Sequence, residues 1–182
     1  LMAEQKRIGW PFDVRKAQEL ENQLLTELEK LKKQAENICH FVPHNLFTPK
    51  RDNKKQGYFA GCEMQRLKEF NPSSREHIAW WFTTFQGWKP TKLTPTGKAV
   101  IDETVLKEIG TEEALVFLNI LVIQKKLGML SQGTNAWLKL VKDGRLHHSC
   151  FIGAVTHRMA HSHPNLAPVS YTHLTLPTKD GV

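Results

Sequence analysis

Residues 70–88 read FNPSSREHIAWWFTTFQGW, and their pattern predicts one strongly apolar helix. Asn71 or Ser73 can cap its N-terminus, and Ser73 with Glu76 fits a capping box, which satisfies two backbone N–H groups of the first turn. Gly87 is a typical residue for the end of a helix. Aromatic side chains at helical spacing can stack on nucleic-acid bases, but we favour a place in the core. They are Trp80, Trp81, Phe82 and Phe85.

A second apolar pattern predicts a long helix earlier in the chain. This helix is expected to begin at PFDV (11–14), where Asp13 can cap it and Phe12 is placed as a hydrophobic staple. Its apolar stripe would suit a coiled-coil partner, but it is short for a coiled coil, so we favour packing against the same chain. The stripe consists of Leu20, Leu24, Leu28, Leu31, Ala35 and Ile38.

Further signals mark the second half of the chain. Asp102 and Thr111 predict the starts of two more helices, and Gly128 predicts the end of the second one. A last helix or turn is expected near 134–142. The stretch DGRLH (143–147) predicts a turn before an extended segment, because Asp-Gly is a strong hairpin signal. Helices followed by a hairpin-like stretch indicate an α+β fold that is mainly α.

Residues 43–69 show no clear periodicity and contain two prolines and two glycines, so they are predicted to form a loop or an extended excursion. Within them lies the basic cluster PKRDNKK (49–55). This cluster could contact phosphates. Runs of charge are more often solvated surface, and we favour that interpretation.

The composition is that of a globular protein with a basic surface. The chain has 182 residues and a formal net charge of +7, and 40% of its residues are hydrophobic. A basic balance favours polyanionic partners such as nucleic acid, although charge alone is weak support. Three distant cysteines without a C-x-x-C motif indicate reduced thiols rather than a disulfide framework. No uninterrupted apolar run approaches the roughly 20 residues of a membrane helix.

Several histidines and one cysteine crowd the region 147–163 and raise the question of a metal site. Their spacing is irregular, and one extended strand cannot aim all of them at one ion, so we expect no metal here. A hydrolytic pair of His148 with Ser149 or Cys150 is also disfavoured, because adjacent strand residues point to opposite faces. The crowded residues are His147, His148, Cys150, His157, His161 and His163.

The stretch GAVTHRMAHSHPNLA (153–167) is better suited to gripping an anion. Thr and His side chains offer donors to phosphate oxygens, and the guanidinium of Arg158 offers a fork of donors. In the DNA minor groove every base pair presents acceptors, so an arginine there can sense base-pair geometry without reading sequence. A structural salt bridge of Arg158 explains the residue equally well at this point.

This stretch resembles the first polymerase motif of family A DNA polymerases, at the start of the palm, and most closely that of the phage replicative branch. Other stretches resemble further motifs of the same family, in the same order, so that the resemblance covers residues 9–167. They are GWPFDVRKAQEL (9–20), FNPSSREHI (70–78), GWKPTKLTPTGKAVIDETVLKEI (87–109), QKKLG (124–128) and DGRLH (143–147).

The resemblance implies how the chain is divided. Residues 1–10 would be the residual link from an upstream proofreading domain. Residues 11–130 would form a thumb-like helical region, and 131–167 would form the start of the palm with its first strands, as part of an incomplete domain. Residues 168–182 resemble no part of the family.

The resemblance also implies a set of DNA-binding residues. Arg158 would reach the minor groove at the primer terminus. Thr156, His157 and Asn165 would help to hold primer or template near it. Lys125 and Lys126 would lie toward the DNA backbone. No catalytic residue and no metal ligand is assigned to this chain.

The implied function is that of a fragment of a DNA-directed DNA polymerase, a nucleotidyltransferase acting in DNA replication. The catalytic aspartates of the family, which hold Mg²⁺, lie in D-x-S-x-x-E and H-D-E motifs, and neither motif occurs in this sequence. We therefore expect the chain alone to be inactive and to bind duplex DNA weakly. The whole enzyme would use primer–template DNA, dNTP and a processivity factor in the cytoplasm, with no membrane. The alternative is a free-standing basic DNA-binding helical module without catalysis.

The segment PVSYTHLTLPTKDGV (168–182) changes character abruptly. VSYTHLTLPT (169–178) resembles the translation, in one frame, of a transposase mosaic-end sequencing adapter. Pro168 is the residue obtained when a Gln codon is cut after its first base and joined to that adapter. We interpret 168–182 as a non-native adapter read-through tail, in preference to a divergent natural tail.

Overall fold

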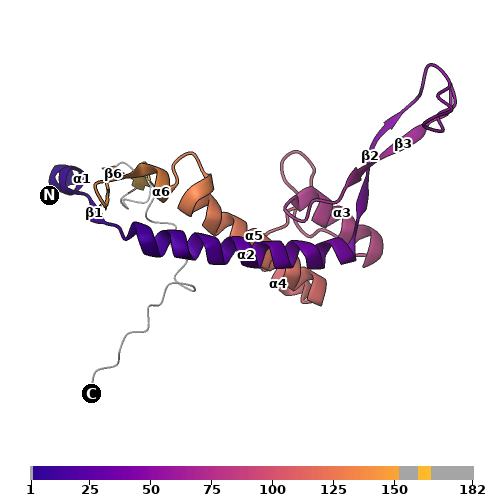
Figure 1. Ribbon diagram of the computed structural model, residues 1–182. Coiled ribbons are helices and arrows are strands. Elements are labelled where there is room, and N and C mark those ends of the chain that lie inside the picture. Colours follow the sequence, from indigo (N-terminus) through magenta and orange to yellow (C-terminus); the bar gives the residue numbers. More distant parts are fainter. Residues whose placement is uncertain (1, 152–159, 165–182) are drawn as a thin grey trace. The chain divides into compact units, whose positions relative to one another are not determined.

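The computed structural model describes residues 2–151 and 160–164 (Figure 1). The chain divides into two units. One comprises Leu25–Gln124, and the other comprises Leu1–Leu24 together with Lys125–Val182. Helices α2 and α5 each run from one unit into the other.

Helix α2 (Val14–Ile38) begins where the sequence predicts. The carboxylate of Asp13 accepts a hydrogen bond from the backbone N–H of Lys16 at 3.0 Å, which satisfies a donor of the first turn. The expected stripe is shifted, because Leu20 is 46% exposed whereas Ala17 is buried. At 3.6 residues per turn Leu20 lies about 60° from the line through Ala17, Leu24 and Leu28, at the edge of the buried face.

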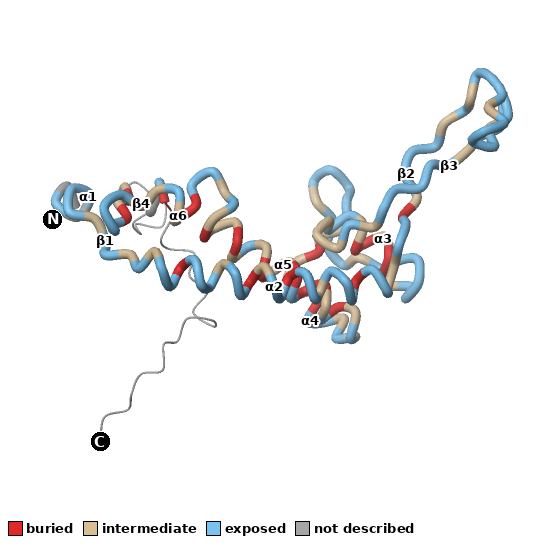
Figure 2. Tube along the Cα trace, viewed as in Figure 1, coloured by how far each residue is buried: buried red, intermediate tan, exposed pale blue. Residues whose placement is uncertain are grey.

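Three helices build the core of the Leu25–Gln124 unit. They are α3 (Arg75–Phe85), α4 (Glu103–Ile109) and the greater part of α5 (Glu112–Leu127). The ring of Phe117 is fully buried, and the rings of Trp81 and Phe82 each lie with their centroids 5.9 Å from it. The buried positions appear red in Figure 2. Trp81 and Phe82 confirm the predicted core role of the aromatic helix, whereas Phe85 is 63% exposed and does not.

The start of α3 differs from the predicted cap. The N-cap is Ser74, whose Oγ accepts from the backbone N–H of His77 at 3.5 Å. Asn71 instead accepts from the N–H of Ser73 through its side-chain oxygen at 2.9 Å, which closes a turn before the helix. The side chain of Ser73 is bonded to Gln124. The prediction of Asn71 or Ser73 as cap was therefore wrong, since both side chains are engaged elsewhere.

The caps of α4 and α5 follow the sequence. Asp102 Oδ1 accepts from the N–H of Val105 at 2.9 Å, and Thr111 Oγ1 accepts from the N–H of Ala114 at 3.3 Å. Between them Gly110 ends α4 in the left-handed conformation, with φ of 67°. A side chain there would be strained, so glycine is the expected residue.

The stretch 43–69, predicted as a loop or an extended excursion, belongs mostly to a β-hairpin. Strand β2 (Phe41–Phe47) pairs antiparallel with β3 (Met64–Glu69), with Phe41 opposite Glu69 and Phe47 opposite Met64. The register shifts between Pro43 and Leu46. Figure 2 shows the hairpin mostly exposed. Because both faces of the hairpin are exposed to solvent, its sequence lacks the alternation of apolar and polar residues that predicts a strand.

Helix α5 ends at Leu127, where the sequence predicts, but the role of Gly128 differs from the prediction. Gly128 does not close the helix. It begins a π-helical turn, η1 (Gly128–Gln132), and Gly133 is the C-cap of this turn. The ammonium of Lys139, on the short helix α6 (Trp137–Leu140), donates to the carbonyls of Gln132 at 3.2 Å and Gly133 at 3.1 Å. The last carbonyl oxygens of a helical segment lack N–H partners within it, and here the Lys139 ammonium supplies the donor.

The other unit contains small antiparallel sheets. Strands β4 (Val141–Lys142) and β5 (Arg145–Leu146) are joined at Asp143 and Gly144, which have φ of 49° and 69°. The predicted Asp-Gly turn is thus confirmed. Strand β1 (Trp10–Pro11), which follows helix α1 (Met2–Ile8), pairs with β5.

A further strand pair follows in the chain. Strand β6 (Ser149–Phe151) is antiparallel to β7 (Ala160–Ser162), with Ser149 opposite Ser162. About half of the described chain is helical and the sheets are small, which agrees with an α+β fold that is mainly α.

The helical span Glu112–Leu140 is long and apolar enough to cross a membrane by length and composition, with a mean hydropathy of 1.5. Core helices of globular proteins meet the same criterion. Phe117, Ile120 and Leu127 of this span are fully buried within the protein itself. We therefore describe it as part of the core.

Candidate nucleic-acid interface

Lys125 and Lys126 lie in the last turn of α5. Lys125 is exposed and Lys126 is half-buried. The helical run continues through η1 to Gln132, so its open carbonyl end lies beyond both lysines. Their assignment to the DNA backbone stays a prediction.

The other four predicted DNA-binding residues lie outside the described residues. Thr156, His157 and Arg158 belong to the stretch between strands β6 and β7, and Asn165 follows β7. The flanking strands are in register, with Cys150 opposite His161. The roles of these four residues also stay predictions.

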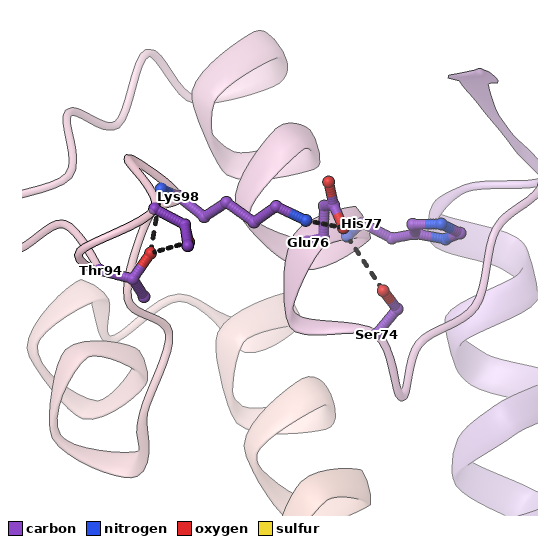
Figure 3. Close-up of polar contacts among 6 residues, drawn as sticks. Ser74, Glu76, His77, Thr94 and Lys98 are labelled. Atoms are coloured by element: carbon purple, nitrogen blue, oxygen red, sulfur yellow. Dashed lines mark hydrogen bonds and ion pairs between the residues drawn. The ribbon is translucent and has the colours of Figure 1, made fainter. Parts of the chain in front are cut away.

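A basic, threonine-rich turn, KPTKLTPTGK (89–98), lies between α3 and α4. Figure 3 shows that it is anchored. The N–H of Thr94 donates to the carbonyl of Lys98 at 2.7 Å, and Thr94 Oγ1 accepts from the N–H of Lys98 at 3.1 Å. The Lys98 ammonium forms an ion pair of 3.2 Å with Glu76 on α3. Lys89 and Lys92 remain exposed, and no carboxylate in the described part of the chain pairs with them.

His77 is a structural histidine rather than a cation. Its Nδ1 accepts the backbone N–H of Asn71 at 2.9 Å, which requires this nitrogen to be unprotonated. Burial lowers the pKa of His77, and the positive charge of Lys68 lowers it further, against a smaller opposing effect of Glu76. At neutral pH its ring therefore adds no positive charge to the surface.

The histidine-rich region yields no metal site in the ranges 2–151 and 160–164. His147 Nδ1 is hydrogen-bonded to the carbonyl oxygen of Lys6 at 3.0 Å, and His148 is buried. Within the same ranges, no group of three or more His, Cys, Asp or Glu side chains could hold an ion. The described residues therefore do not fit a magnesium site, and we assign no magnesium ligand to them.

Comparison with known proteins identifies relatives of the chain. No protein-family model matches it. The chain is 32% identical over 219 residues to a DNA-directed DNA polymerase of Enterobacteria phage T3, and 31% identical over 219 residues to that of Escherichia phage T7. Each match covers 93% of this chain and 31% of the relative, so the chain spans about a third of the length of these curated relatives.

A solved structure resembles the chain in fold. It is the polymerase domain of Pol1 from M. smegmatis, in complex with DNA primer-template and dNTP. The TM-score is 0.58 at 19% identity, over 91% of this chain and 24% of that chain. With 31–32% identity along 93% of its length, the chain is homologous to the DNA-directed DNA polymerases of these two phages.

Proposed function

We propose that the chain is part of a DNA-directed DNA polymerase and that it holds primer–template duplex during template-directed replication. Residues 11–130 would serve as the thumb and 131–167 as the start of the palm. The observation that carries the proposal is the 31–32% identity with the phage polymerases along 93% of the chain. A basic, mainly helical scaffold with exposed lysines at its turns supports it.

Each proposed contact has a chemical basis. The Arg158 guanidinium would donate to the minor-groove acceptors of the terminal base pair, which are present whatever the sequence. Thr156, His157 and Asn165 would donate to nearby phosphate or sugar oxygens, and Lys125 and Lys126 would lie toward the backbone. The exposed Lys89 and Lys92 extend the same surface chemistry to the anchored turn.

The chemical step is assigned to other parts of the whole polymerase. Neither the D-x-S-x-x-E nor the H-D-E motif occurs in this sequence, so we expect no nucleotidyl transfer by this chain alone. The whole protein would bind Mg²⁺, dNTP and a processivity factor, and would act in the cytoplasm. A free-standing DNA-binding module is less favoured, because the relatives that match the chain are named polymerases.

The test is binding of the purified chain to a fluorescent primer–template, measured by anisotropy at several salt concentrations. We expect weak binding whose logarithm falls linearly with the logarithm of salt concentration. Arg158→Ala should lose about 1–3 kcal/mol of binding free energy. Lys125→Gln with Lys126→Gln should weaken binding more than the matched pair Lys32→Gln with Lys33→Gln, two exposed lysines on α2. Two results would contradict the proposal. One is binding whose affinity depends neither on salt concentration nor on the Arg158→Ala substitution. The other is primer extension by the chain alone.

A further inference from the structure

The tip of the β2–β3 hairpin is an ordered element. The N–H of Asn53 donates to the carbonyl of Tyr58 at 2.8 Å, and the N–H of Tyr58 donates back to the carbonyl of Asn53 at 3.0 Å. The N–H of Gly61 donates to the carbonyl of Pro49 at 3.0 Å. These bonds close a small secondary hairpin within residues 49–61, so side chains on it are held in fixed relative positions before any ligand binds.

Four cations project from this tip: Lys50, Arg51, Lys54 and Lys55 are all exposed. In the described ranges none of the four has an ion-pair partner.

The single carboxylate among these cations is already engaged. Asp52 Oδ1 accepts the backbone N–H of Ala60 at 2.7 Å, which fixes this carboxylate against the turn. The tip therefore concentrates positive charge that no ion pair within residues 2–151 and 160–164 neutralises, and this charge complements a polyanion.

An exposed aromatic ring accompanies the cations. Phe59 is 63% exposed, although both of its aromatic neighbours in the hairpin are packed. The ring of Tyr58 meets that of Phe47 edge-on at 5.1 Å, and the guanidinium of Arg66 lies 4.4 Å from the centroid of Phe47 on the same stack. Tyr58, Phe47 and Arg66 thus contact one another, whereas the side chain next to Tyr58, Phe59, is largely exposed to solvent.

We propose that the hairpin tip, residues 49–61, binds single-stranded nucleic acid. Lys50, Arg51, Lys54 and Lys55 contact successive phosphates, and an unpaired base stacks on Phe59. Basic side chains combined with an exposed aromatic ring are the means by which proteins hold single strands without reading sequence. A duplex offers the phosphates but keeps its base faces stacked, and an acidic peptide offers charge without a flat ring. The inference goes beyond the proposed function, which assigns duplex binding to other residues.

The test is anisotropy of the 182-residue chain with short oligothymidylate, oligouridylate and duplex DNA of equal length. Phe59→Ala should weaken binding of both single strands about fivefold or more, the equivalent of about 1 kcal/mol for one stacked base, and should leave duplex binding unchanged. Phe41→Ala, an exposed phenylalanine at the foot of the same hairpin, is the matched control and should change neither.

Lys54→Gln with Lys55→Gln provides a second, independent variant. It should lower the salt dependence of single-strand binding by a slope of about 1.4, at about 0.7 for each phosphate contact. Lys32→Gln with Lys33→Gln removes the same charge from α2 and should lower it less. Comparable losses for oligothymidylate and oligouridylate place recognition in the shared phosphate and base chemistry, whereas a loss for only one names that polymer as the ligand.

Two results would overturn the inference. One is single-strand binding that neither tip variant weakens beyond its control. The other is displacement of the oligonucleotides by polyglutamate at equal charge concentration together with insensitivity to Phe59→Ala, which would assign the tip to an acidic protein segment. Because Arg158 and the α5 lysines are intact in all these variants, loss of single-strand binding with retained duplex binding separates this inference from the proposed function.

Discussion

Helices α3 and α4, most of α5 and the β2–β3 hairpin belong to one unit, but the helices and the hairpin are stabilised in different ways. In the helices Phe82, Phe117 and Ile120 are removed entirely from water, so burial of apolar surface is the main stabilising term. In the hairpin most strand residues are exposed, and backbone hydrogen bonds with the Arg66–Phe47–Tyr58 stack hold it. The difference separates a region that maintains the fold from one whose side chains are available to a ligand.

The largest expected effect is in the aromatic core. Phe117→Ala removes a fully buried ring that contacts Phe70, Trp81 and Phe82, and should cost about 3–5 kcal/mol of unfolding free energy, through lost burial and the cavity left behind. Urea denaturation followed by tryptophan fluorescence measures this. Phe85→Ala, at the exposed end of α3, is the control and should cost about 1 kcal/mol or less. Equal costs for the two would remove the distinction between core and surface aromatics.

A smaller effect is expected at a helix end. Asp102→Ala leaves the Val105 N–H without its acceptor and should cost about 1 kcal/mol of unfolding free energy. Asp102→Ser, which keeps a capping oxygen, should recover most of it. The midpoint temperatures of thermal unfolding measure both effects. If Asp102→Ser is as unstable as Asp102→Ala, loss of the capping hydrogen bond is not the cause.

Charged groups of the hairpin affect the protonation of His77 on α3. Burial and the nearby Lys68 lower the pKa of His77 below its ordinary value of 6.5. At a pH between the folded-state pKa and 6.5, the unfolded chain binds a proton at His77 that the folded chain does not. The contribution of His77 to the unfolding free energy is therefore complete above pH 6.5 and is lost as the pH falls through the folded pKa. Of the other facing groups, His44 also lowers the pKa and Glu76 raises it.

Unfolding free energies of the wild type and His77→Gln across this pH range test the assignment. The wild type should lose stability on acidification more steeply than the variant does. Parallel curves for the two proteins would show that another group titrates.

The smallest effect is expected on the hairpin strands. Leu67 on β3 is 68% exposed, so Leu67→Ala should change the unfolding free energy by about 0.5 kcal/mol or less. Val42→Ala, at a buried position of β2, should cost more, because its side chain leaves water on folding. A large loss of unfolding free energy in Leu67→Ala would mean that the Leu67 side chain is covered by other parts of the protein in solution, contrary to its exposure here.

The sequence predicted the helical part of the fold well, for a physical reason. Asp13, Asp102 and Thr111 are short polar side chains directly before apolar periodic stretches, and all three accept the hydrogen bonds that a helix start requires. Ser74 was missed as a cap because three polar candidates, Asn71, Ser73 and Ser74, precede α3, and the hydrogen bonds that engage the first two side chains elsewhere are not visible in the local pattern.

The hairpin could not be predicted in the same way. Strand signals depend on one buried face, and in β2–β3 only Val42 is buried. Likewise, the π-helical turn at Gly128 depends on contacts beyond the local sequence, including the Lys139 ammonium bonded to its last carbonyls. The candidate DNA-binding residues came from a family resemblance. The distinction between Lys98, which pairs with Glu76, and Lys89 and Lys92, which pair with no carboxylate among the described residues, required the structure.

We infer that a buried helical core supports exposed residues that contact nucleic acid. The most direct test is amide hydrogen exchange of the whole chain, measured alone, with oligothymidylate and with primer–template. Oligothymidylate should slow exchange in residues 49–61, and primer–template should slow it around 125–126 and 153–165. Amides in α3 and α4 should exchange at the same rate in all three samples. Protection confined to these core helices, or absent from both sets of exposed residues, would contradict the account.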